Sequence, residues 1–259
     1  MKSKKGKSLC IFSAKGGVGK SITTLNLAGV FAELDKKVLI IDLDTTSGGI
    51  ALALNIPFKK SIYNLWADLN NNRYQKFAKY ITKYNENISF LASPKDPRQG
   101  TKITAKFIDL IIDRAEFMYD VILIDTNHYL NEINLVTLDK VQNILFVVSN
   151  DPMDLKNMKS LISIFTEVNI LNFKVLLNAS INPYKDYFAS SDIENVIGVN
   201  VDYVLSNKFF IKNIDDYIMN GEIPTLDKKV IGSYTADCST LMTIASDILG
   251  SSDEVKKDE

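Results

Sequence analysis

The 259-residue chain has an ordinary globular composition, with 46% hydrophobic and 24% charged residues and a formal net charge of −1. This composition excludes an intrinsically disordered chain and allows one large α/β domain or two small ones. The small net charge does not favour a general nucleic-acid binder. No apolar run approaches the ~18 residues of a membrane span, and no signal-peptide core follows the lysine-rich start, so we expect a cytoplasmic protein.

Charge is unevenly distributed along the chain. Residues 55–106 carry ten Lys/Arg against three Asp/Glu, whereas residues 181–259 carry seven against fourteen. Such asymmetry marks either a partner surface or solvated helix faces that differ in sign. The basic segment leaves DNA open as a partner, although overall charge does not favour it. The two cysteines, Cys10 and Cys238, lack the close spacing of a metal site.

The first predicted elements are a flexible tail over residues 1–8, a buried strand over 9–12 and a helix that ends near residue 34. Between strand and helix lies SAKGGVGKS, residues 13–21. A strand, a glycine-rich turn and Gly-Lys-Ser at a helix start are typical of a phosphate-binding loop. There Lys20 reaches the β/γ-phosphates and the Ser21 hydroxyl ligates Mg²⁺. The flanking strand and helix argue against the alternative, a glycine-rich turn that binds nothing.

The loop departs from the general pattern G-x-x-x-x-G-K-[ST], because Ala14 stands at the first glycine and Lys15 follows it. In this it resembles the deviant Walker A motif of the MinD/ParA family of ATPases. The resemblance implies bound ATP and Mg²⁺, and catalytic roles for Lys15 and Lys20. It also implies a homodimer through the ATP site, with Lys15 reaching the partner's nucleotide. The implied nucleotide contacts in this loop are Lys15, Gly16, Gly17, Val18, Gly19, Lys20, Ser21 and Ile22.

The apolar run 38–41 predicts a strand buried on both faces, and it ends in Asp42-Leu43-Asp44. Carboxylates at a strand end beside a phosphate loop lie where α/β sheets place their chemistry. The family has an Asp-x-Asp here, so the resemblance implies that Asp42 lies near the metal and that the catalytic Asp44 orients the attacking water. The alternative is that both aspartates cap a following turn. Residues 45–48 depart from the family's Pro-Gln-Gly-Asn.

Two short helices are predicted next, over 61–69 and 74–84, and then a strand over 88–92 that ends in Ser93-Pro94. This arrangement, with its Leu-Ala-x-Pro turn, resembles the TadZ/CpaE branch of the family, which serves tight-adherence (Tad) pilus assembly. Related ParA and flagellar-number proteins have comparable insertions. Partition and flagellar roles therefore remain alternatives to a pilus role.

A helix over 103–118 leads to the apolar run 119–125, which ends in Asp125. This is a Walker B-type strand, whose aspartate holds Mg²⁺ through water. The predicted metal residues are therefore Ser21, Asp42 and Asp125. The family's Thr-Pro-Pro is replaced after this strand by Thr126-Asn127-His128. We interpret His128, the only histidine, as a loop residue without a catalytic role.

The remaining predicted strands cover 143–148, 173–178 and 201–205, and the remaining helices cover 151–168, 186–197 and 229–249. Asp151 is either a helix N-cap or a polar residue linked to the switch. The resemblance implies that Asn178 bonds the adenine edge and that Ser206 lies by the base. No Asn-Lys-x-Asp guanine motif occurs, which favours adenine.

Alternating strands and helices over residues 9–249 predict one α/β domain with a doubly wound, mostly parallel sheet and helices on both faces, a P-loop NTPase three-layer sandwich. Residues 250–259 form a predicted disordered tail. The resemblance implies an ATP-dependent dimerising switch with slow, dimer-gated hydrolysis that positions pilus or other polar machinery, concentrated at a cell pole. An ATP-binding scaffold with little hydrolysis is the alternative. Residues 235–249 contain no basic residue, so direct membrane insertion is not expected.

Overall fold

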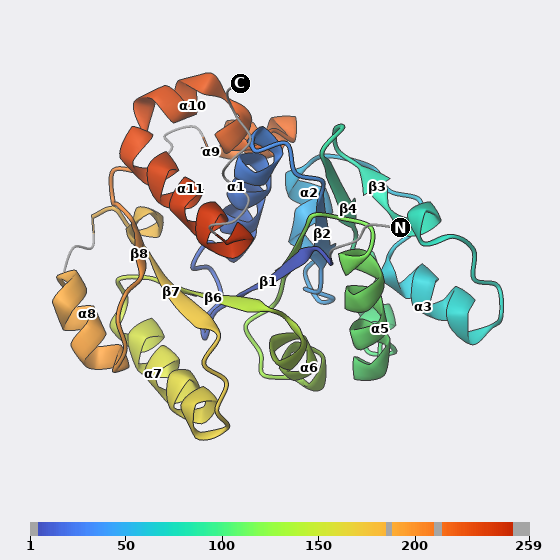
Figure 1. The fold of residues 1–259 in the computed structure, drawn as a ribbon, viewed down its shortest axis with the longest axis horizontal. Coiled ribbons are helices and arrows are strands. Elements are labelled where there is room, and N and C mark those ends of the chain that lie inside the picture. The colour runs from blue at the N-terminus through green and yellow to red at the C-terminus, as the bar shows by residue number, and fades with distance from the viewer. Residues whose placement is uncertain (1–4, 185–187, 210–213, 251–259) are drawn as a thin grey trace.

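A computed structural model describes residues 5–184, 188–209 and 214–250. Its eight strands form one sheet in the order β3-β4-β2-β5-β1-β6-β7-β8 (Figure 1). All neighbouring strands are parallel except the β3–β4 pair at one edge. The strands are β1 (Lys7–Phe12), β2 (Val38–Asp42), β3 (Thr82–Lys83), β4 (Ile88–Leu91), β5 (Val121–Asp125), β6 (Asn143–Val148), β7 (Phe173–Asn178) and β8 (Tyr203–Leu205).

Helices cover both faces of this sheet (Figure 1). One face carries α1 (Lys20–Glu33), α2 (Gly49–Ala53), α9 (Ile214–Asn220), α10 (Lys228–Ser233) and α11 (Thr235–Leu249). The other carries α3 (Ile62–Asn70), α5 (Ala105–Glu116), α6 (Glu132–Lys140), α7 (Pro152–Glu167) and α8 (Ser190–Ile197). The short elements are α4 (Pro97–Gly100) and the 3₁₀ turns η1 (Phe77–Tyr80), η2 (Ala179–Ile181) and η3 (Pro224–Leu226). The predicted three-layer α/β sandwich is confirmed.

The sheet has a hydrophobic core on each of its two faces, because successive side chains of a strand point to opposite faces. In β2, Val38 and Ile40 enter the core beneath α1 and α11, whereas Leu39 and Ile41 enter the core beneath α5. All five residues of β2 and of β5 are buried. This double burial is why the sequence shows continuous apolar runs at these strands rather than alternation. None of the described helices is long and apolar enough to cross a bilayer.

Several predicted boundaries differ from the structure. The helix expected over 74–84 is instead the turn η1 followed by β3, because Thr82 pairs with Phe90 and extends the sheet by one antiparallel edge strand. The final helix is divided at Tyr234 into α10 and α11, and α2 and α9 were not predicted. Residues 251–259 of the predicted tail, and part of the helix expected over 186–197, lie outside the described residues.

The predicted flexible tail over 1–8 also needs correction, since β1 begins at Lys7 and Gly6 and Ser8 are buried. Gly6 N–H donates to the Glu116 carbonyl at 2.7 Å. Residues 1–4 lie outside the described part of the chain. The prediction was wrong because Lys5, just before this strand, has two acidic partners at the amino edge of the sheet, Asp113 and Glu116, which the local sequence does not reveal.

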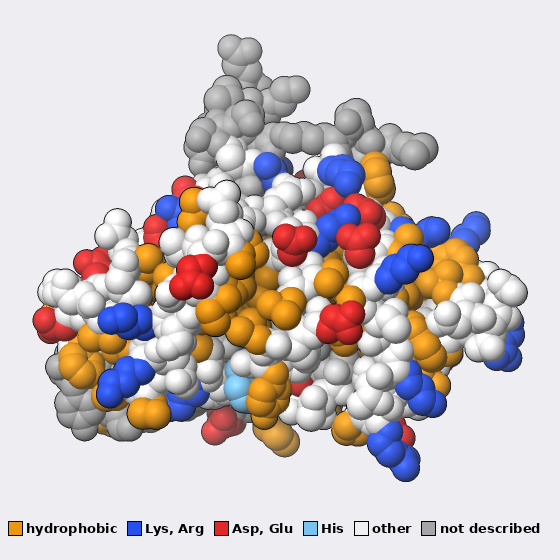
Figure 2. Space-filling view, turned by 90° about the horizontal axis from the view of Figure 1, so that it is seen from below, with side chains coloured by type: hydrophobic (Ala, Val, Ile, Leu, Met, Phe, Trp, Pro, Cys, Tyr) orange, Lys and Arg blue, Asp and Glu red, His pale blue; other side chains and the backbone are white. Residues whose placement is uncertain are grey.

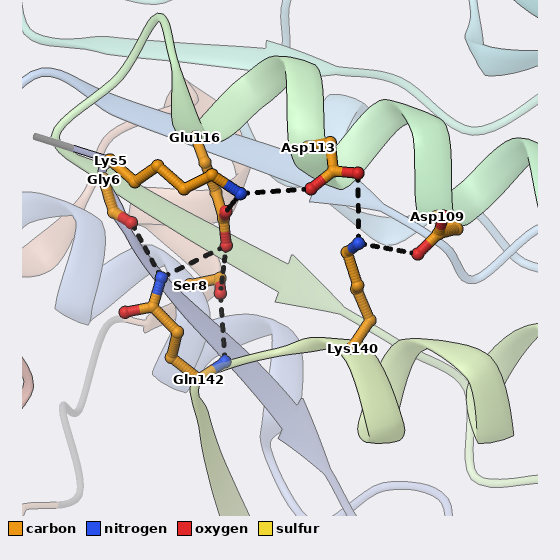
Figure 3. Close-up of polar contacts among 8 residues, drawn as sticks. All are labelled: Lys5, Gly6, Ser8, Asp109, Asp113, Glu116, Lys140 and Gln142. Carbon is orange, nitrogen blue, oxygen red and sulfur yellow. Dashed lines mark hydrogen bonds and ion pairs between the residues drawn. The ribbon is translucent and has the colours of Figure 1, made fainter. Parts of the chain in front are cut away.

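These partners form an amino-edge network (Figure 3), composed of Lys5, Ser8, Asp109, Asp113, Glu116, Lys140 and Gln142. Its centre is Glu116, which is 4% exposed. One Glu116 oxygen accepts from Ser8 Oγ at 2.8 Å and from Gln142 Nε2 at 3.3 Å, and the other lies 3.3 Å from Lys5 Nζ. The network therefore ties the start of β1 to α5 and β6.

Replacing Glu116 by alanine is expected to lower the free energy of unfolding by about 1–3 kcal/mol, because the buried Ser8 hydroxyl loses its acceptor. Urea unfolding measures this change. Asp109→Ala is the matched control: the Asp109 side chain is 48% exposed and pairs only with Lys140 among the described residues, so we expect a change within about 0.5 kcal/mol. Equal effects of the two substitutions would contradict the central position of Glu116.

Candidate functional site: a phosphate loop between β1 and α1

The site lies at the carboxyl edge of the sheet, where β1, β2 and β5 end side by side. Asp42 and Asp125 are the last residues of β2 and β5 and are direct neighbours in the strand register. Both carboxylates are fully buried. The loop between β1 and α1 leads from the central strand over this edge, because β1 lies between β5 and β6. The fold therefore brings together three segments that are far apart in sequence.

The loop between β1 and α1 has the backbone of a phosphate cradle. Gly17 and Gly19 adopt φ values of +78° and +90°, which side-chain-bearing residues rarely adopt. A Cβ at Gly19 would also lie 2.5 Å from the Asn178 amide nitrogen, so no side chain fits there. Gly19 directly precedes α1, whose first N–H groups and dipole favour an anion at this point. This geometry fits a nucleotide's phosphates.

Lys20 is the buried cation of this loop, with 8% of its surface exposed. Its Nζ donates to the Ser13 hydroxyl at 2.8 Å, and Ser13 in turn donates to the Lys15 carbonyl at 2.6 Å. No carboxylate forms an ion pair with Lys20 within the described residues. Burial lowers the pKa of Lys20, and the charge of Asp125 opposes that shift. A buried ammonium bonded only to a neutral hydroxyl is suited to receive an anion.

The predicted metal residues meet at the start of α1. Ser21 Oγ donates to Asp125 at 2.7 Å, and Thr24 Oγ1 lies 3.4 Å from the other Asp125 oxygen. Burial raises the pKa of Asp125 to about 6, and burial together with the nearby Asp125 charge raises the pKa of Asp42. When both of these buried carboxylates are ionised, they repel each other and lack solvation by water. A divalent cation beside them would offset both effects.

Mg²⁺ fits this donor set. Among the described residues no group of three or more His, Cys, Asp or Glu side chains is placed to hold a metal ion. A cation here would therefore take the Ser21 hydroxyl, phosphate oxygens and waters, with Asp125 and Asp42 behind them. This is the coordination that Mg²⁺ prefers at phosphate sites, since it dehydrates reluctantly.

The two aspartates after β2 organise the segment that follows them. Asp42 accepts hydrogen bonds from the backbone N–H groups of Asp44 and Ile50, both at 3.1 Å. Asp44 Oδ1 accepts from Thr46 N at 3.2 Å and from Ser47 N at 3.0 Å. Both side chains therefore cap the turn that follows β2, as the alternative to a catalytic role predicts. Asp44 Oδ2 accepts none of the hydrogen bonds found among the described residues, so the capping geometry leaves one oxygen for other chemistry.

Lys15, the second lysine of the loop, has a different environment from Lys20. Its side chain is 41% exposed, and its Nζ lies 3.1 Å from Asp151 Oδ1. Asp151 also caps α7, accepting from the backbone N–H groups of Met153 and Asp154. Hydrogen bonds from the α7 backbone N–H groups, and the charge and hydrogen bond of Lys15, lower the pKa of Asp151. The interpretation of Asp151 as a helix N-cap is therefore confirmed, and the role linked to the switch stays a prediction.

A cavity of about 260 Å³ adjoins the phosphate loop. Its lining is largely apolar and comprises Ile22, Thr23, Asn26, Asn178, Ser180, Ile181, Leu205, Phe209, Ile214 and Ile218. Ile22 and Thr23 lie in the first turn of α1. A largely apolar space beside a phosphate loop fits a nucleobase. The cavity lies where β7 and β8 end, again at the carboxyl edge.

The two residues predicted to contact the base differ in position. Asn178 lines the cavity, but its amide is already bonded at both ends: Nδ2 donates to the Val18 carbonyl at 3.1 Å, and Oδ1 accepts from Ser180 Oγ at 2.6 Å. Asn178 therefore tethers the phosphate loop. Ser206 does not line the cavity, and its N–H and hydroxyl bond the Asp237 carboxylate at 2.7 and 3.1 Å.

Sequence reasoning missed Ser13, Thr24 and Asn26 as site residues. Thr24 could have been found, because position i+3 from Ser21 lies on the same helix face. Ser13 and Asn26 gave no local signal, since their roles depend on Lys20 and on the cavity. His128 is a loop residue, as interpreted, and its ring lies against the loop: a Cβ at Gly16 would be 3.3 Å from Nδ1.

Fold and site together define a P-loop nucleotide-binding α/β protein. A comparison with protein families matches residues 6–177 to AAA_31, described as an AAA domain. One curated relative, a septum site-determining protein MinD of Emiliania huxleyi, is 23% identical over 194 residues, which are 74% of this chain and 71% of the relative. Across the first three curated relatives the matched part spans 42% to 71% of their length.

Two solved structures share the fold. A ParA family ATPase from Chlorobium tepidum has a TM-score of 0.77 and 19% identity, covering 92% of this chain and 98% of its own. MinD from Pyrococcus horikoshii, complexed with Mg-ADP, has a TM-score of 0.74 and 20% identity, covering 94% and 96%. The chain belongs to the AAA domain family AAA_31, and it is similar in sequence to MinD proteins and in fold to a ParA family ATPase and to MinD.

Proposed function

We propose that this protein is an ATP-dependent dimerising switch that hydrolyses ATP to ADP and phosphate and thereby positions cellular machinery. The observation that carries the proposal is the contrast between the two loop lysines. Lys20 is buried under the cradle, whereas Lys15 is 41% exposed at the edge of the site and is paired with Asp151. An exposed lysine beside a nucleotide site can reach a second chain. Relatives named for septum-site determination and chromosome partition support a positioning role.

In the proposed mechanism this chain's residues position charge around the phosphates. The cradle N–H groups and Lys20 bind the β- and γ-phosphates, and Ser21 with Asp125 and Asp42 holds Mg²⁺. When bound, Mg²⁺ neutralises charge on the phosphate oxygens. Asp44 aligns the attacking water through its unengaged oxygen, and Lys15 of the partner subunit completes the site. Because catalysis here depends on positioning and charge neutralisation, dimerisation gates hydrolysis and makes it slow.

The specific role that we propose is tight-adherence pilus assembly at a cell pole. It rests on the resemblance of the helix α3, the strand β4 with its Leu91-Ala92-Ser93-Pro94 turn and the helix α5 to the TadZ/CpaE branch, although the second helix of that arrangement, expected over 74–84, is replaced by η1 and β3. The alternatives are a ParA-like partition protein, a flagellar-number protein and a scaffold with little hydrolysis. Thr45-Thr46-Ser47 and Asn127-His128, which depart from the family pattern, favour the scaffold. Co-purification of this protein with a pilus secretion ATPase, and not with DNA, supports the pilus role.

Several basic residues of the segment 55–106 have a partner close by, and for this reason we place DNA behind a protein partner. Within residues 55–106, Lys60 pairs with Asp68 and Arg98 with Asp96, and Lys95 and Lys102 lie over aromatic rings. On the right of Figure 2 the basic side chains are separated by uncharged and apolar surface rather than forming a continuous stripe. Non-specific DNA binding needs several basic side chains free to contact phosphates.

Asp44→Asn tests hydrolysis and discriminates between the two interpretations of Asp44. Asparagine keeps an oxygen that accepts from Thr46 and Ser47, so the turn is retained, but it lacks the charge that acts on water. Single-turnover phosphate release is expected to fall about 100-fold or more. Release that is unchanged in Asp44→Asn would mean that Asp44 only caps the turn, and no release by the wild type would favour the scaffold.

A further inference from the structure

A second cavity, of about 440 Å³, lies beside the turn that follows β2, and no residue of the phosphate loop lines it. Its volume is within the range of ligand-binding pockets. Three segments contribute its lining: residues between 46 and 52, in the turn and in α2, then residues 55–58, and then residues 93–95 after β4. The site described so far gives this cavity no role.

The lining combines apolar surface with one cation. Leu52 lines the cavity and is 73% exposed, so apolar surface extends from the cavity to the outside of the molecule. Lys95 is the charged residue of the described lining, and its Nζ lies 4.9 Å from the centre of the Phe58 ring. Lys95 forms no ion pair with a carboxylate of the described residues, so its charge is available to a ligand. This arrangement is complementary to an apolar group with an acid next to it.

The chain around the cavity carries a surplus of positive charge. Two of the three lining segments, 55–58 and 93–95, belong to residues 55–106, which contain ten Lys/Arg against three Asp/Glu. Lys59, directly after Phe58, is exposed and pairs with no carboxylate in the part of the chain that the structure describes. Clustered charge of one sign steers partners of the opposite sign. The charge therefore favours an acidic occupant over a basic one.

The cavity wall formed by residues 46–48 is the turn that Asp44 caps. Besides the two hydrogen bonds to its carboxylate, the Asp44 carbonyl accepts from the Gly48 N–H at 2.9 Å. Gly48 has a φ of +58°, and a Cβ there would clash with the buried Ser93 hydroxyl, so the turn packs closely against the segment after β4. An occupant of the cavity would therefore contact the segment that Asp44 holds in place.

We propose that this cavity docks a segment of a partner protein in which a large apolar side chain stands next to an aspartate or a glutamate. The apolar side chain fills the cavity against Phe58 and Leu52, and the acid pairs with Lys95. The proposal rests on the positioning function proposed above, for which it names the chemistry of the partner. The docked segment lies against the turn that Asp44 caps, beside the nucleotide site.

The test selects binders to the full chain from a library of random short peptides displayed on phage, and measures their affinity by fluorescence anisotropy. We expect the selected peptides to carry Leu, Phe or Trp beside Asp or Glu. Lys95→Glu should weaken their binding about 10-fold or more, because the pair becomes one of like charges. Lys95 is exposed, so this variant should fold.

Lys79→Glu is the matched control, since Lys79 is exposed in the same basic segment but does not line the cavity. Its effect on peptide binding should stay below about 2-fold, because solvent and salt screen charges at a distance. A peptide in which lysine replaces the acid should regain affinity for Lys95→Glu, since the charges of the pair are then exchanged.

The outcomes separate this inference from the proposed function. Selection of no specific peptide, selection of peptides without an acid beside the apolar residue, or equal losses in Lys95→Glu and Lys79→Glu would overturn the docking site. Duplex DNA that binds the wild type but not Lys95→Glu would assign this lysine to nucleic acid and overturn it as well. Peptide binding is measured without ATP, so a wild type that binds the peptides but releases no phosphate would overturn the proposed hydrolysis and leave the docking site intact.

Discussion

Lys20→Met is expected to abolish nucleotide binding and to lower ATP turnover by about 100-fold or more. The wild-type lysine is buried and bonded to the neutral Ser13 hydroxyl, so its charge is available to the phosphates. Removing one such preorganised donor costs this much in comparable charge-stabilising sites. In the wild type, Mg-ATP at 100 times its Kd should stabilise the fold by about 2.7 kcal/mol, which raises Tm by roughly 5–10 °C.

The measurement is a thermal transition with and without Mg-ATP, together with phosphate release. In Lys20→Met the ATP-induced rise in Tm should vanish. Lys140→Met is the control, because Lys140 belongs to the amino-edge network, away from the carboxyl edge, and pairs with Asp109 and Asp113. A rise in Tm with ATP that is as large in Lys20→Met as in the wild type would contradict the assignment of the loop as the phosphate site.

Lys15→Ala is expected to reduce turnover about 100-fold and to make turnover per chain independent of protein concentration. The reason is that the lysine acts in the partner's site, where a cation supplied in trans stabilises transition-state charge. Turnover measured against protein concentration detects both effects. Unchanged turnover in Lys15→Ala would refute the trans role. Lys174→Ala is the matched control, because Lys174 is likewise exposed and paired with an aspartate, Asp202.

Asp151→Asn should act in the opposite direction from Lys15→Ala. Asparagine caps a helix as well as aspartate does, so α7 is retained, but the charge that holds Lys15 at 3.1 Å is lost. Because the pair is partly exposed, its contribution is about 0.2–1 kcal/mol. Dimerisation in ATP, followed by sedimentation, should therefore strengthen by about 1.4–5-fold. Weaker dimerisation in this variant would show that Asp151 belongs to the dimer interface instead.

The sequence alone was sufficient to predict a parallel sheet covered by helices on both faces and to locate the phosphate loop. Continuous apolar runs such as 38–41 and 121–124 predict doubly buried parallel strands, and the glycine spacing predicts the loop, because both signals are local. The same locality explains why Asp42 and Asp125 could be placed at one edge: each ends such a strand, and the carboxyl ends of parallel strands coincide.

The tertiary structure alone decided which groups are available to a ligand. Asn178 ends β7, as predicted, yet only packing shows that its amide is bonded to Val18 and Ser180. Lys15 and Lys20 are five residues apart, and only the fold pairs one with Asp151 and buries the other. Hydrogen-bond partners distant in sequence leave no local pattern, so availability is decided by long-range contacts rather than by motif.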